Sequence, residues 1–489
     1  MPSHDWQLVE PRPRTAQCES RPAGVSRRQW LAQSACGFGS LALAGLLGPA
    51  AHAAPADPLA PKPPHLPARA KRILFLFMQG GPSHVDTFDY KPELTRRDGE
   101  EVDLYVARTR QVSRERLFGS PWPFRRHGES GTWVSELFPH VARHADQLCM
   151  IKSVHTEGVA HGPATLMIHT GATSLVRPSM GAWVTYGLGT HNDSLPGFVT
   201  LSPPPAMGGA RNYAAAFLPA VYQGSVIGRA EQPFVHARLP HIANEKWSSL
   251  EQQRQLALLG DVNRMQLAGA PASDELDAVI RSFELANRMQ DVVPTVMDLG
   301  QETAETQQLY GLDDPATADY GRQCLLARRL AEAGVRYIQV NYADNSNGNP
   351  RWDQHSNLQR HEIHARAVDK PIAGLLTDLK RRGLLDDTLV WWGGEFGRTP
   401  YAQGRDGRDH NPLGFTVWLA GAGTRPGFSY GATDDFGHQA VHERVHMHDL
   451  HATLLYLLGL DHERLTYRYA GRDFRLTDVH GRVVREVLL

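Results

Sequence analysis

Four stretches of the chain carry imidazoles, three of them together with carboxylates, and these side chains most often bind transition metals and move protons. In chain order, the residues are His84, Asp86, His161, Asp353, His355, Glu395, Asp409 and His410. Mixed oxygen and nitrogen donors suit zinc, manganese or iron better than calcium, which prefers an all-oxygen shell. The sequence therefore predicts a divalent-metal site, with zinc, manganese, iron and calcium as the candidate ions.

Short apolar runs precede these stretches and predict buried strands. The runs cover residues 72–78, 147–155, 335–340 and 388–392, and a further run covers residues 415–420. In parallel α/β sheets, ligands bind in the loops beyond the carboxyl ends of the strands. The four stretches are therefore expected to meet at one edge of a sheet.

Helical patterns separate the strands. Helices are expected over residues 164–169, with an amino terminus near His161, and over residues 244–290, 317–333 and 362–382. A late helix is expected from residue 446, where Asp449 is in a position to cap it. This alternation predicts an α/β fold with a doubly wound, mostly parallel sheet and helices on both faces. The charged, leucine-rich residues around 244–330 are expected to form a helical insertion that covers the sheet.

Two features of the chain could bind an anion. The helix that begins near His161 presents free N–H groups and the positive end of its dipole. The guanidinium of Arg398 could bind an oxyanion through two hydrogen bonds, or it could form a salt bridge to a neighbouring carboxylate. Together with Arg398, His84 and Asp409 are the candidate contacts to a substrate.

Composition and charge exclude some partners. The chain has 51 Lys and Arg against 52 Asp and Glu, a formal net charge of −1, so no overall field draws it to nucleic acid or an anionic membrane. No stable membrane span is expected in the mature chain, and the sequence does not indicate an oligomeric state. Cys149 and Cys324 are expected to be buried free thiols, although a disulfide between them stays open.

The amino terminus has the features of an export signal. Paired arginines at 27 and 28 precede a weakly apolar run to Gly48 and an A-x-A site at 51–53. This order resembles a twin-arginine (Tat) signal, whereas a membrane anchor would need a longer run, of roughly 20 apolar residues. Residues 1–53 are therefore expected to be a Tat-type signal peptide and residues 54–70 a Pro/Ala-rich linker. Residues 71–489 are expected to form one domain in the periplasm or outside the cell.

Several motifs resemble one bacterial family. In chain order, they are GGPSHVDTFD, HGPA…HTG, WDQH, GGEFGRTP, GRDHNP, YGATDDFG and HDLHATLLYLLGLD. From residue 71 to the carboxyl terminus, the chain resembles the domain of unknown function 1501, which is sulfatase-like and lies within the alkaline phosphatase superfamily. The resemblance implies an alkaline phosphatase-like fold and one or two divalent metals that activate a nucleophile and stabilise phosphoryl or sulfuryl oxygens.

The resemblance also assigns metal ligands. DTLVWWGGEFG is similar to the superfamily's DTLVIFTSDHG, and the loop after the first strand adds one more candidate carboxylate. The metal ligands predicted in this way are Asp86, Asp353, His355, Glu395 and His410. Two other ligand positions depart from the pattern, because Phe396 stands in place of a histidine and Gln79 in place of an aspartate.

The helix start HGPATLMIHTG resembles the sulfatase signature C-x-P-S-R-x-x-L-x-T-G, with His161 at the nucleophilic cysteine and Thr165 at the arginine. No Cys or Ser occupies the nucleophile position, which excludes a formylglycine sulfatase. His161 could attack directly, Thr156 or Thr165 could serve, or water activated by the metal could replace a covalent step. The predicted catalytic residues are His161, Thr165 and Arg398.

Two functions are consistent with these features. The first is an exported metal-dependent hydrolase of sulfate or phosphate esters, acting on a small molecule or a polysaccharide. The second is a catalytically degenerate protein of the same fold that binds an anion or a glycan.

Overall fold

A nine-stranded sheet forms the centre of the protein. The computed structural model describes residues 57–239, 247–269, 274–343 and 350–489, so the expected signal peptide lies outside the described residues. The strand order is β14-β6-β13-β10-β1-β9-β7-β8, and β17 pairs with β6. The strands are β1 (Arg72–Met78), β6 (Leu148–His155), β7 (Phe198–Leu201), β8 (Ser225–Ile227), β9 (Tyr337–Tyr342), β10 (Thr388–Gly393), β13 (Phe415–Ala420), β14 (Phe428–Tyr430) and β17 (Val445–His446).

The sheet is mostly parallel. β1 pairs in parallel with β10 and with β9, and β7 continues the parallel part from β9 to β8. β13 is antiparallel to both of its neighbours, β10 and β6. The predicted α/β fold with a mostly parallel sheet is confirmed, and the parallel strands β10, β1, β9, β7 and β8 all end at one edge.

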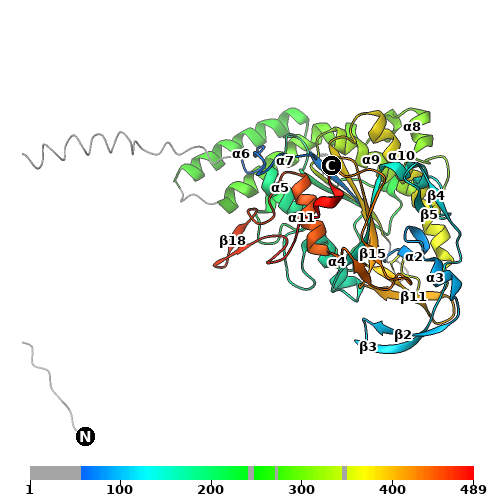
Figure 1. Cartoon of the computed structure of the whole chain (residues 1–489). Helices are drawn as coiled ribbons and strands as arrows, with labels where there is room; N and C mark the ends of the chain where they lie inside the picture. Colours follow the sequence, from blue (N-terminus) through cyan, green and yellow to red (C-terminus); the bar gives the residue numbers. More distant parts are fainter. Residues whose placement is uncertain (1–56, 240–246, 270–273, 344–349) are drawn as a thin grey trace, which may run out of the picture. The chain divides into compact units, whose positions relative to one another are not determined.

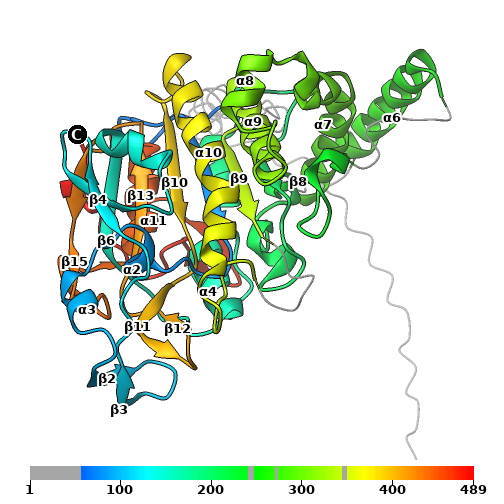
Figure 2. The same ribbon diagram turned by 90° about the vertical axis from the view of Figure 1, so that its right-hand side faces the viewer.

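Helices cover both faces of the sheet (Figures 1 and 2). On one face α9 and α10 pack against each other, whereas α4, α5 and α11 lie on the other face. These helices are α4 (His161–Thr170), α5 (Met180–Leu188), α9 (Ala318–Glu332), α10 (Arg360–Arg381) and α11 (Met447–Leu457).

The segment expected as a helical insertion, around residues 244–330, is helical over most of its described length. It contains α6 (Ser249–Gly269), α7 (Asp274–Met297), α8 (Ala304–Leu309) and most of α9. Residues 244–246 and 270–273 of this segment lie outside the described residues.

Aromatic packing holds α4 against the middle of the sheet. The rings of Phe75 in β1 and Trp391 in β10 are stacked, with their centroids 3.7 Å apart. The ring of His169 in α4 meets Phe77 edge-on at 4.7 Å. Because these strands are buried on both faces, they are continuous apolar runs in the sequence. The packing places the first turn of α4 at the carboxyl edge of the sheet.

Short antiparallel pairs lie beyond that edge (Figure 2). β11 (Gly397–Gln403) and β12 (Gly407–Asn411) form one pair directly after β10. β2 (Glu101–Val106) and β3 (Gln111–Arg116) form another. These pairs supply side chains to the site described below.

The residues expected to form a linker are attached to the domain from Asp57 onward. The N–H of Lys62 donates to the carbonyl of Leu188 at 2.9 Å, and the N–H of Leu66 donates to the carbonyl of Gly459 at 2.9 Å. Ala70 is buried, and its N–H donates to the carbonyl of Leu457. This segment therefore packs on the loops after α5 and α11.

Three smaller expectations can be compared with the structure. Cys149 and Cys324 are both buried and free, as predicted. Asp449 does take part in capping α11, because its carboxylate accepts the N–H of His446 at 2.9 Å, although His446 is the N-cap residue. Within the described ranges, no helix is long and apolar enough to cross a membrane.

Candidate metal centre

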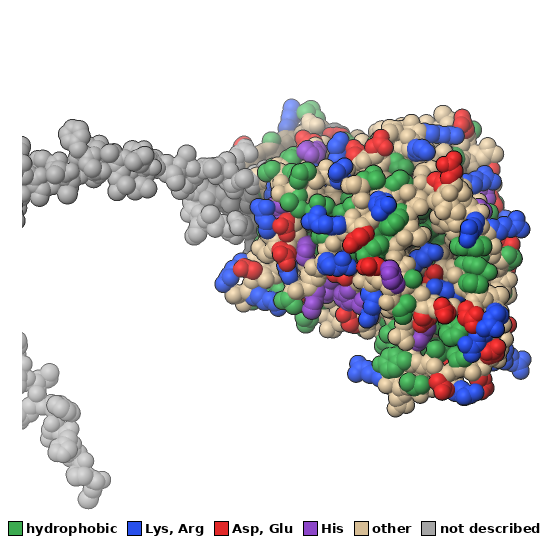
Figure 3. All heavy atoms as spheres, in the orientation of Figure 1, with side chains coloured by type: hydrophobic (Ala, Val, Ile, Leu, Met, Phe, Trp, Pro, Cys, Tyr) green, Lys and Arg blue, Asp and Glu red, His purple; other side chains and the backbone are tan. Residues whose placement is uncertain are grey.

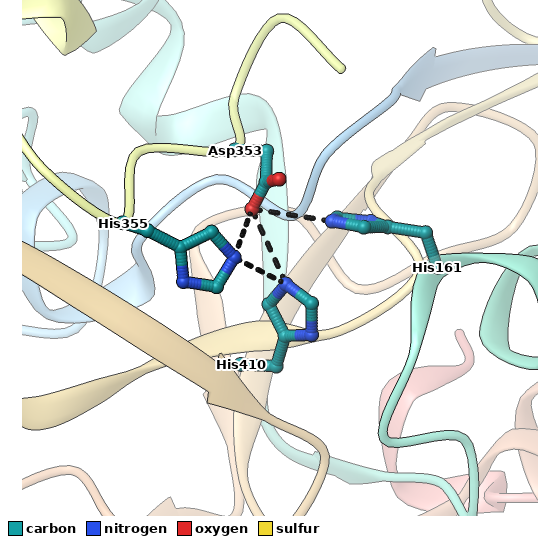
Figure 4. A group of neighbouring side chains, drawn as sticks. All are labelled: His161, Asp353, His355 and His410. Atoms are coloured by element: carbon teal, nitrogen blue, oxygen red, sulfur yellow. Dashed lines mark hydrogen bonds and ion pairs between the residues drawn. The ribbon is translucent and has the colours of Figure 1, made fainter. Parts of the chain in front are cut away.

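Four side chains from three separate parts of the chain meet beyond the carboxyl edge of the sheet (Figure 4). His161 is the first residue of α4, Asp353 and His355 lie in the loop between β9 and α10, and His410 belongs to β12. One donor atom from each side chain lies within 4.8 Å of the other three. The structure thus brings together four of the residues singled out in the sequence.

The carboxylate of Asp353 is the centre of this group. Its Oδ1 atom lies 2.9 Å from Nε2 of His355 and 3.2 Å from Nε2 of both His161 and His410. The Nε2 atoms of His355 and His410 are 3.0 Å apart. All three imidazoles therefore direct the same ring nitrogen toward one carboxylate oxygen.

The other ring nitrogen of each imidazole, Nδ1, donates its N–H to an oxygen outside the group. The acceptors are the carboxylate of Glu395 for His161 at 2.6 Å, the carbonyl of Val159 for His410 at 2.9 Å, and Oε1 of Gln403 for His355. A neutral imidazole has one proton, so a proton on Nδ1 leaves a lone pair on Nε2. Metal-binding histidines are held by outer partners in this way.

These donors fit a divalent metal. Three inward lone pairs and a carboxylate oxygen repel one another unless a proton or a cation lies among them. Nε2 of His161 is buried and has no hydrogen-bond partner among the described residues, although it lies 3.2 Å from Asp353. Three imidazoles with one carboxylate form a set that binds zinc and related transition metals.

Protons compete with a metal for the same atoms. Burial opposes a charge on His161, but its contacts with the carboxylates of Asp353 and Glu395, first that of Asp353, raise its pKa. The hydrogen bond to Asp353 also raises the pKa of His355, whereas burial lowers the pKa of His410. Despite its own burial, the pKa of Asp353 falls far below the usual range because the three imidazoles and Arg398 surround it. Acid is therefore expected to displace a bound metal.

Arg398 is fully buried behind Asp353. Its Nη2 donates to Oδ1 of Asp353 at 2.6 Å, and its Nε donates to the carbonyl of Gly81 at 3.0 Å. Nη1 donates to the carbonyl of Arg408 at 3.2 Å. Of the two alternatives for Arg398, the structure has the salt bridge to a neighbouring carboxylate, because the guanidinium donors already have protein acceptors.

Glu395 lies behind His161 and not among the inward-facing donors. Its side chain is fully buried, and its two oxygens accept the N–H of Gly80 at 2.9 and 3.1 Å in addition to Nδ1 of His161. The sequence predicts Glu395 as a direct metal ligand. Its position is instead that of a carboxylate that orients a metal-binding histidine.

Asp86 and His84 lie outside the four-residue group. The carboxylate of Asp86 is fully buried and forms a salt bridge with Arg408, in which Oδ2 lies 2.7 Å from Nε. Nε2 of His84 donates to the carbonyl of Gly437 at 2.7 Å. Asp86 is thus an internal counter-ion of a buried guanidinium, and this pairing replaces its predicted position as a metal ligand.

Thr165 and Asp409 flank the group. Thr165 lies one turn after His161 on α4, and its buried hydroxyl has no hydrogen-bond partner among the described residues. Asp409 lies 3.7 Å from Nδ1 of His355 and forms a salt bridge with the exposed Arg108 at 3.2 Å. Their catalytic and substrate-binding roles stay predictions.

The ring of Phe396 forms an apolar wall beside the group. Its centroid lies 4.4 Å from the ring of His410 and 5.0 Å from that of His161. The backbone next to it must be glycine, because Gly81 has a φ of +69° and a Cβ there would lie 2.7 Å from the Phe396 ring. An apolar wall strengthens the electrostatic interactions of the donors by excluding water.

Three contributors to the site are not predicted from the sequence. The carbonyl of Val159 has no residue signature, because any residue carries it. Arg108 lies in the turn between β2 and β3, 301 positions before Asp409 of β12, which it contacts. Gln403 stands between the GGEFGRTP and GRDHNP motifs, and this position is the only signal for it in the sequence.

The fold and the site together define a class: an α/β protein with a three-histidine, one-aspartate group of metal-ligand type beyond the carboxyl edge of its sheet. No curated protein matches the chain. A family model does match, over residues 70–488. The chain belongs to this family, which is described as "Protein of unknown function (DUF1501)".

Several solved structures are similar to this one at a distant level. The lipoteichoic acid synthase LtaP from Listeria monocytogenes has 11% identity and a TM-score of 0.36, over 86% of this chain and 78% of that chain. The PsFucS1 sulfatase from Pseudoalteromonas sp. has 11% identity and a TM-score of 0.34, over 81% and 68%. An alkaline phosphatase from the Antarctic bacterium TAB5 has 11% identity and a TM-score of 0.32, over 76% and 97%.

Proposed function

We propose that the protein is an exported, metal-dependent hydrolase of sulfate or phosphate esters. His161, Asp353, His355 and His410 would hold the divalent ion, and this donor set suits zinc, manganese or iron better than calcium. The substrate would be an ester of a small molecule or a polysaccharide. The periplasmic or extracellular location rests on the amino-terminal signal in the sequence.

One observation carries the metal part of the proposal. The three Nε2 atoms meet at Oδ1 of Asp353, while every Nδ1 is committed to an oxygen outside the group. Histidines that only pack in the core or cap a helix do not need to face one common atom. A shared focus of three lone pairs and one carboxylate is stable only with positive charge at its centre.

A divalent ion bound here would supply Lewis acidity toward an ester oxygen and toward water. The chain's own residues set its surroundings. Glu395 holds the tautomer of His161, and Arg398 fixes the carboxylate of Asp353. Because α4 begins at His161, its free N–H groups lie next to the site and can hold an anionic group of a substrate.

The ester class is supported by the sulfatase-like motifs of the sequence. The position of His161 indicates whether this residue can be the nucleophile. Its Nδ1 contacts Glu395, and its Nε2 faces Asp353. A histidine with both nitrogens committed is a poor nucleophile. The geometry therefore favours attack by water over attack by His161.

Elemental analysis and an ester panel test the proposal together. The purified protein is expected to contain a stoichiometric transition metal and to hydrolyse at least one aryl sulfate, phosphate monoester, phosphate diester or phosphonate ester. Chelation should stop the hydrolysis, and added metal should restore it. Asp353→Asn should lose both metal and activity, while His480→Ala, which changes an exposed histidine, should keep both. A wild-type protein that stays free of metal after incubation with zinc, manganese and iron would overturn the proposal.

The commitment of both His161 nitrogens also favours a second candidate function, a catalytically degenerate protein that binds an anion or a glycan. The same experiment separates the two. Stoichiometric metal without hydrolysis of any ester in the panel would favour the binding protein.

A further inference from the structure

A second cavity lies at the same edge of the sheet as the metal centre. It has a volume of about 450 Å³, within the range of cavities that bind small ligands. Its walls come from the residues that follow β7 and end β9 and from the start of α9, whose position beside β9 is visible in Figure 2. The lining residues used below include Ser202, Asp319, Gln323, Tyr342 and Arg351.

Three lining residues, Ser202, Tyr320 and Gln323, have polar side-chain atoms that are buried without a hydrogen-bond partner among the described residues. The hydroxyl of Ser202, a residue 3% exposed, and Oε1 of Gln323, a residue 4% exposed, have no hydrogen-bond partner among the described residues. Ser202 also has a φ of +48°, a backbone conformation that residues other than glycine rarely adopt. Unpaired buried polar atoms and unusual backbone angles are both features of ligand sites.

Three charged residues line the cavity, and two of them, Asp319 and Arg351, already have partners, while the third is the carboxylate of Glu231. Oδ1 of Asp319 accepts the N–H of Phe234 at 2.5 Å. The guanidinium of Arg351 lies over the ring of Tyr342 at 4.9 Å, and its Nε donates to the carbonyl of Ala343 at 3.3 Å. Asp319 also disfavours an anion in the cavity. The cavity thus offers the hydroxyls of Ser202 and Tyr320, the amide oxygen of Gln323 and the ring of Tyr342, which suit a neutral, hydroxyl-rich ligand.

The cavity and the metal centre share a loop. Arg351 lines the cavity, and Asp353, two residues later, is the centre of the metal group. Two residues span at most about 7 Å. β9, which ends at the cavity, is also paired with β1, whose end adjoins Glu395 through Gly80. A ligand of more than one sugar unit can therefore reach both places.

We infer that this cavity binds an uncharged saccharide unit, and that the ester lies on the neighbouring unit of the same glycan, at the metal centre. Saccharide binding in the cavity rests on Ser202 and Gln323. Only the position of the ester rests on the proposed function. The substrate class would then be esters of oligosaccharides or polysaccharides and not of simple alcohols.

Gln323→Leu and Ser202→Ala test this directly. Oγ of Ser202 and Oε1 of Gln323 have no hydrogen-bond partner among the described residues, so their loss should change thermal stability little. Thr416→Val in β13 is the matched control, because its buried hydroxyl also has no partner among the described residues and does not line the cavity. The probe is a printed array of neutral glucan, galactan, mannan and fucan oligosaccharides and their sulfated and phosphorylated forms.

The wild type and Thr416→Val are expected to retain at least one neutral oligosaccharide of the array. Each cavity variant should bind it about tenfold more weakly, the effect of losing one hydrogen bond to a ligand. Asp353→Asn should still bind it. Absence of any retained neutral glycan, or equal binding by Gln323→Leu and the wild type, would overturn the inference.

The two proposals can fail separately. If esters are hydrolysed but Gln323→Leu leaves KM for every sulfated or phosphorylated oligosaccharide unchanged, the cavity inference fails and the hydrolase stands. If no ester is hydrolysed while neutral glycan binding depends on Gln323, the hydrolase fails and the saccharide site stands.

Discussion

Two groups of histidines in this protein differ in what their ring nitrogens face. The inner histidine group surrounds the carboxylate of Asp353 and consists of His161, His355 and His410. The outer histidine group consists of His155, His446, His448 and His480, whose rings contact one another in a chain, two pairs edge-on and one pair stacked, with centroids 4.9 to 5.3 Å apart. Figure 3 shows histidine side chains gathered on the surface near α4 and α11.

Each nitrogen that bonds in the outer group has a separate partner. Nδ1 of His446 accepts the N–H of His448 at 3.2 Å, and its Nε2 lies 2.7 Å from the carboxylate of Glu157. Nε2 of His448 donates to the carbonyl of Gly171 at 2.9 Å. These bonds cap α11 and attach it to the end of α4.

The comparison shows that histidine density does not define a metal site. The stretch richest in histidine, residues 446–451, belongs mainly to the outer group. The inner group draws its members from three distant motifs. What distinguishes it is a central carboxylate and an acceptor behind each ring, the arrangement that fixes tautomers for metal binding.

Removal of one inner histidine should have the largest effect. His410→Ala takes away one of four donors, so metal affinity is expected to fall by more than the 10–100-fold typical of a change in an outer partner. His155→Ala and His480→Ala in the outer group should leave affinity unchanged. Competition with a fluorescent chelator measures all three variants. Equal losses in the two groups would break the distinction between them.

Glu395→Gln should have the next largest effect. The amide can still accept from His161, but it lacks the charge that stabilises the Nδ1 proton. Metal affinity is expected to fall about 10–100-fold while the metal stoichiometry at saturation is retained. Loss of stoichiometry at saturating metal would show instead that Glu395 binds the ion itself.

Acid should destabilise the protein through two buried histidines that belong to neither group. Burial lowers the pKa of His169 to about 4 and that of His451 to about 3. The unfolded chain takes up these protons below a pH of about 6.5, whereas the folded chain stays neutral. The contribution of each histidine to the free energy of unfolding is therefore complete above a pH of about 6.5. It decreases as the pH falls toward 4 for His169 and toward 3 for His451, and the loss at pH 5 is about 2 kcal/mol for each residue.

Urea unfolding at pH 7.5 and pH 5.0 measures this loss. His451→Gln keeps a donor for the carbonyl of Ile168 but does not titrate, so it should reduce the loss by about 2 kcal/mol relative to the wild type. Measurement with chelator present keeps metal release out of the comparison. An identical loss in the variant would exclude His451 as a source of acid sensitivity.

Glu157→Ala should have the smallest effect. Its contact with His446 lies at the surface, and exposed ion pairs contribute less than about 1 kcal/mol. Only a slight change in the thermal midpoint is expected, with no change in metal content. A metal content that falls in this variant would indicate that the outer group also binds a metal.

The fold could be predicted because the buried strands are also apolar runs. β1 and β13 begin and end at the predicted residues, and β6, β9 and β10 differ by one or two positions at their ends. The antiparallel direction of β13 could not be predicted, since an apolar run looks the same in either direction. It follows from the turn through β11 and β12.

The metal centre could be predicted only in part. Residue type singled out Asp353, His355 and His410, which the structure brings together with His161, but it cannot separate a carboxylate that faces a metal from one that faces a histidine. Glu395 and Asp86 therefore entered the predicted ligand set, while their neighbours His161 and Arg408 determine what they do. The conformation of the loops decides which way each carboxylate faces, and this conformation cannot be inferred from the sequence pattern.

The chain distances across the centre have a consequence for folding. His161 and Glu395 are 234 residues apart in the chain, and Val159 and His410 are 251 apart. Contacts of such high sequence separation form late, because the entropy of closing the intervening loop must be overcome first. A metal would therefore bind at this place only after the sheet is assembled. Once bound, it would raise the free energy of unfolding in proportion to the logarithm of the free metal concentration.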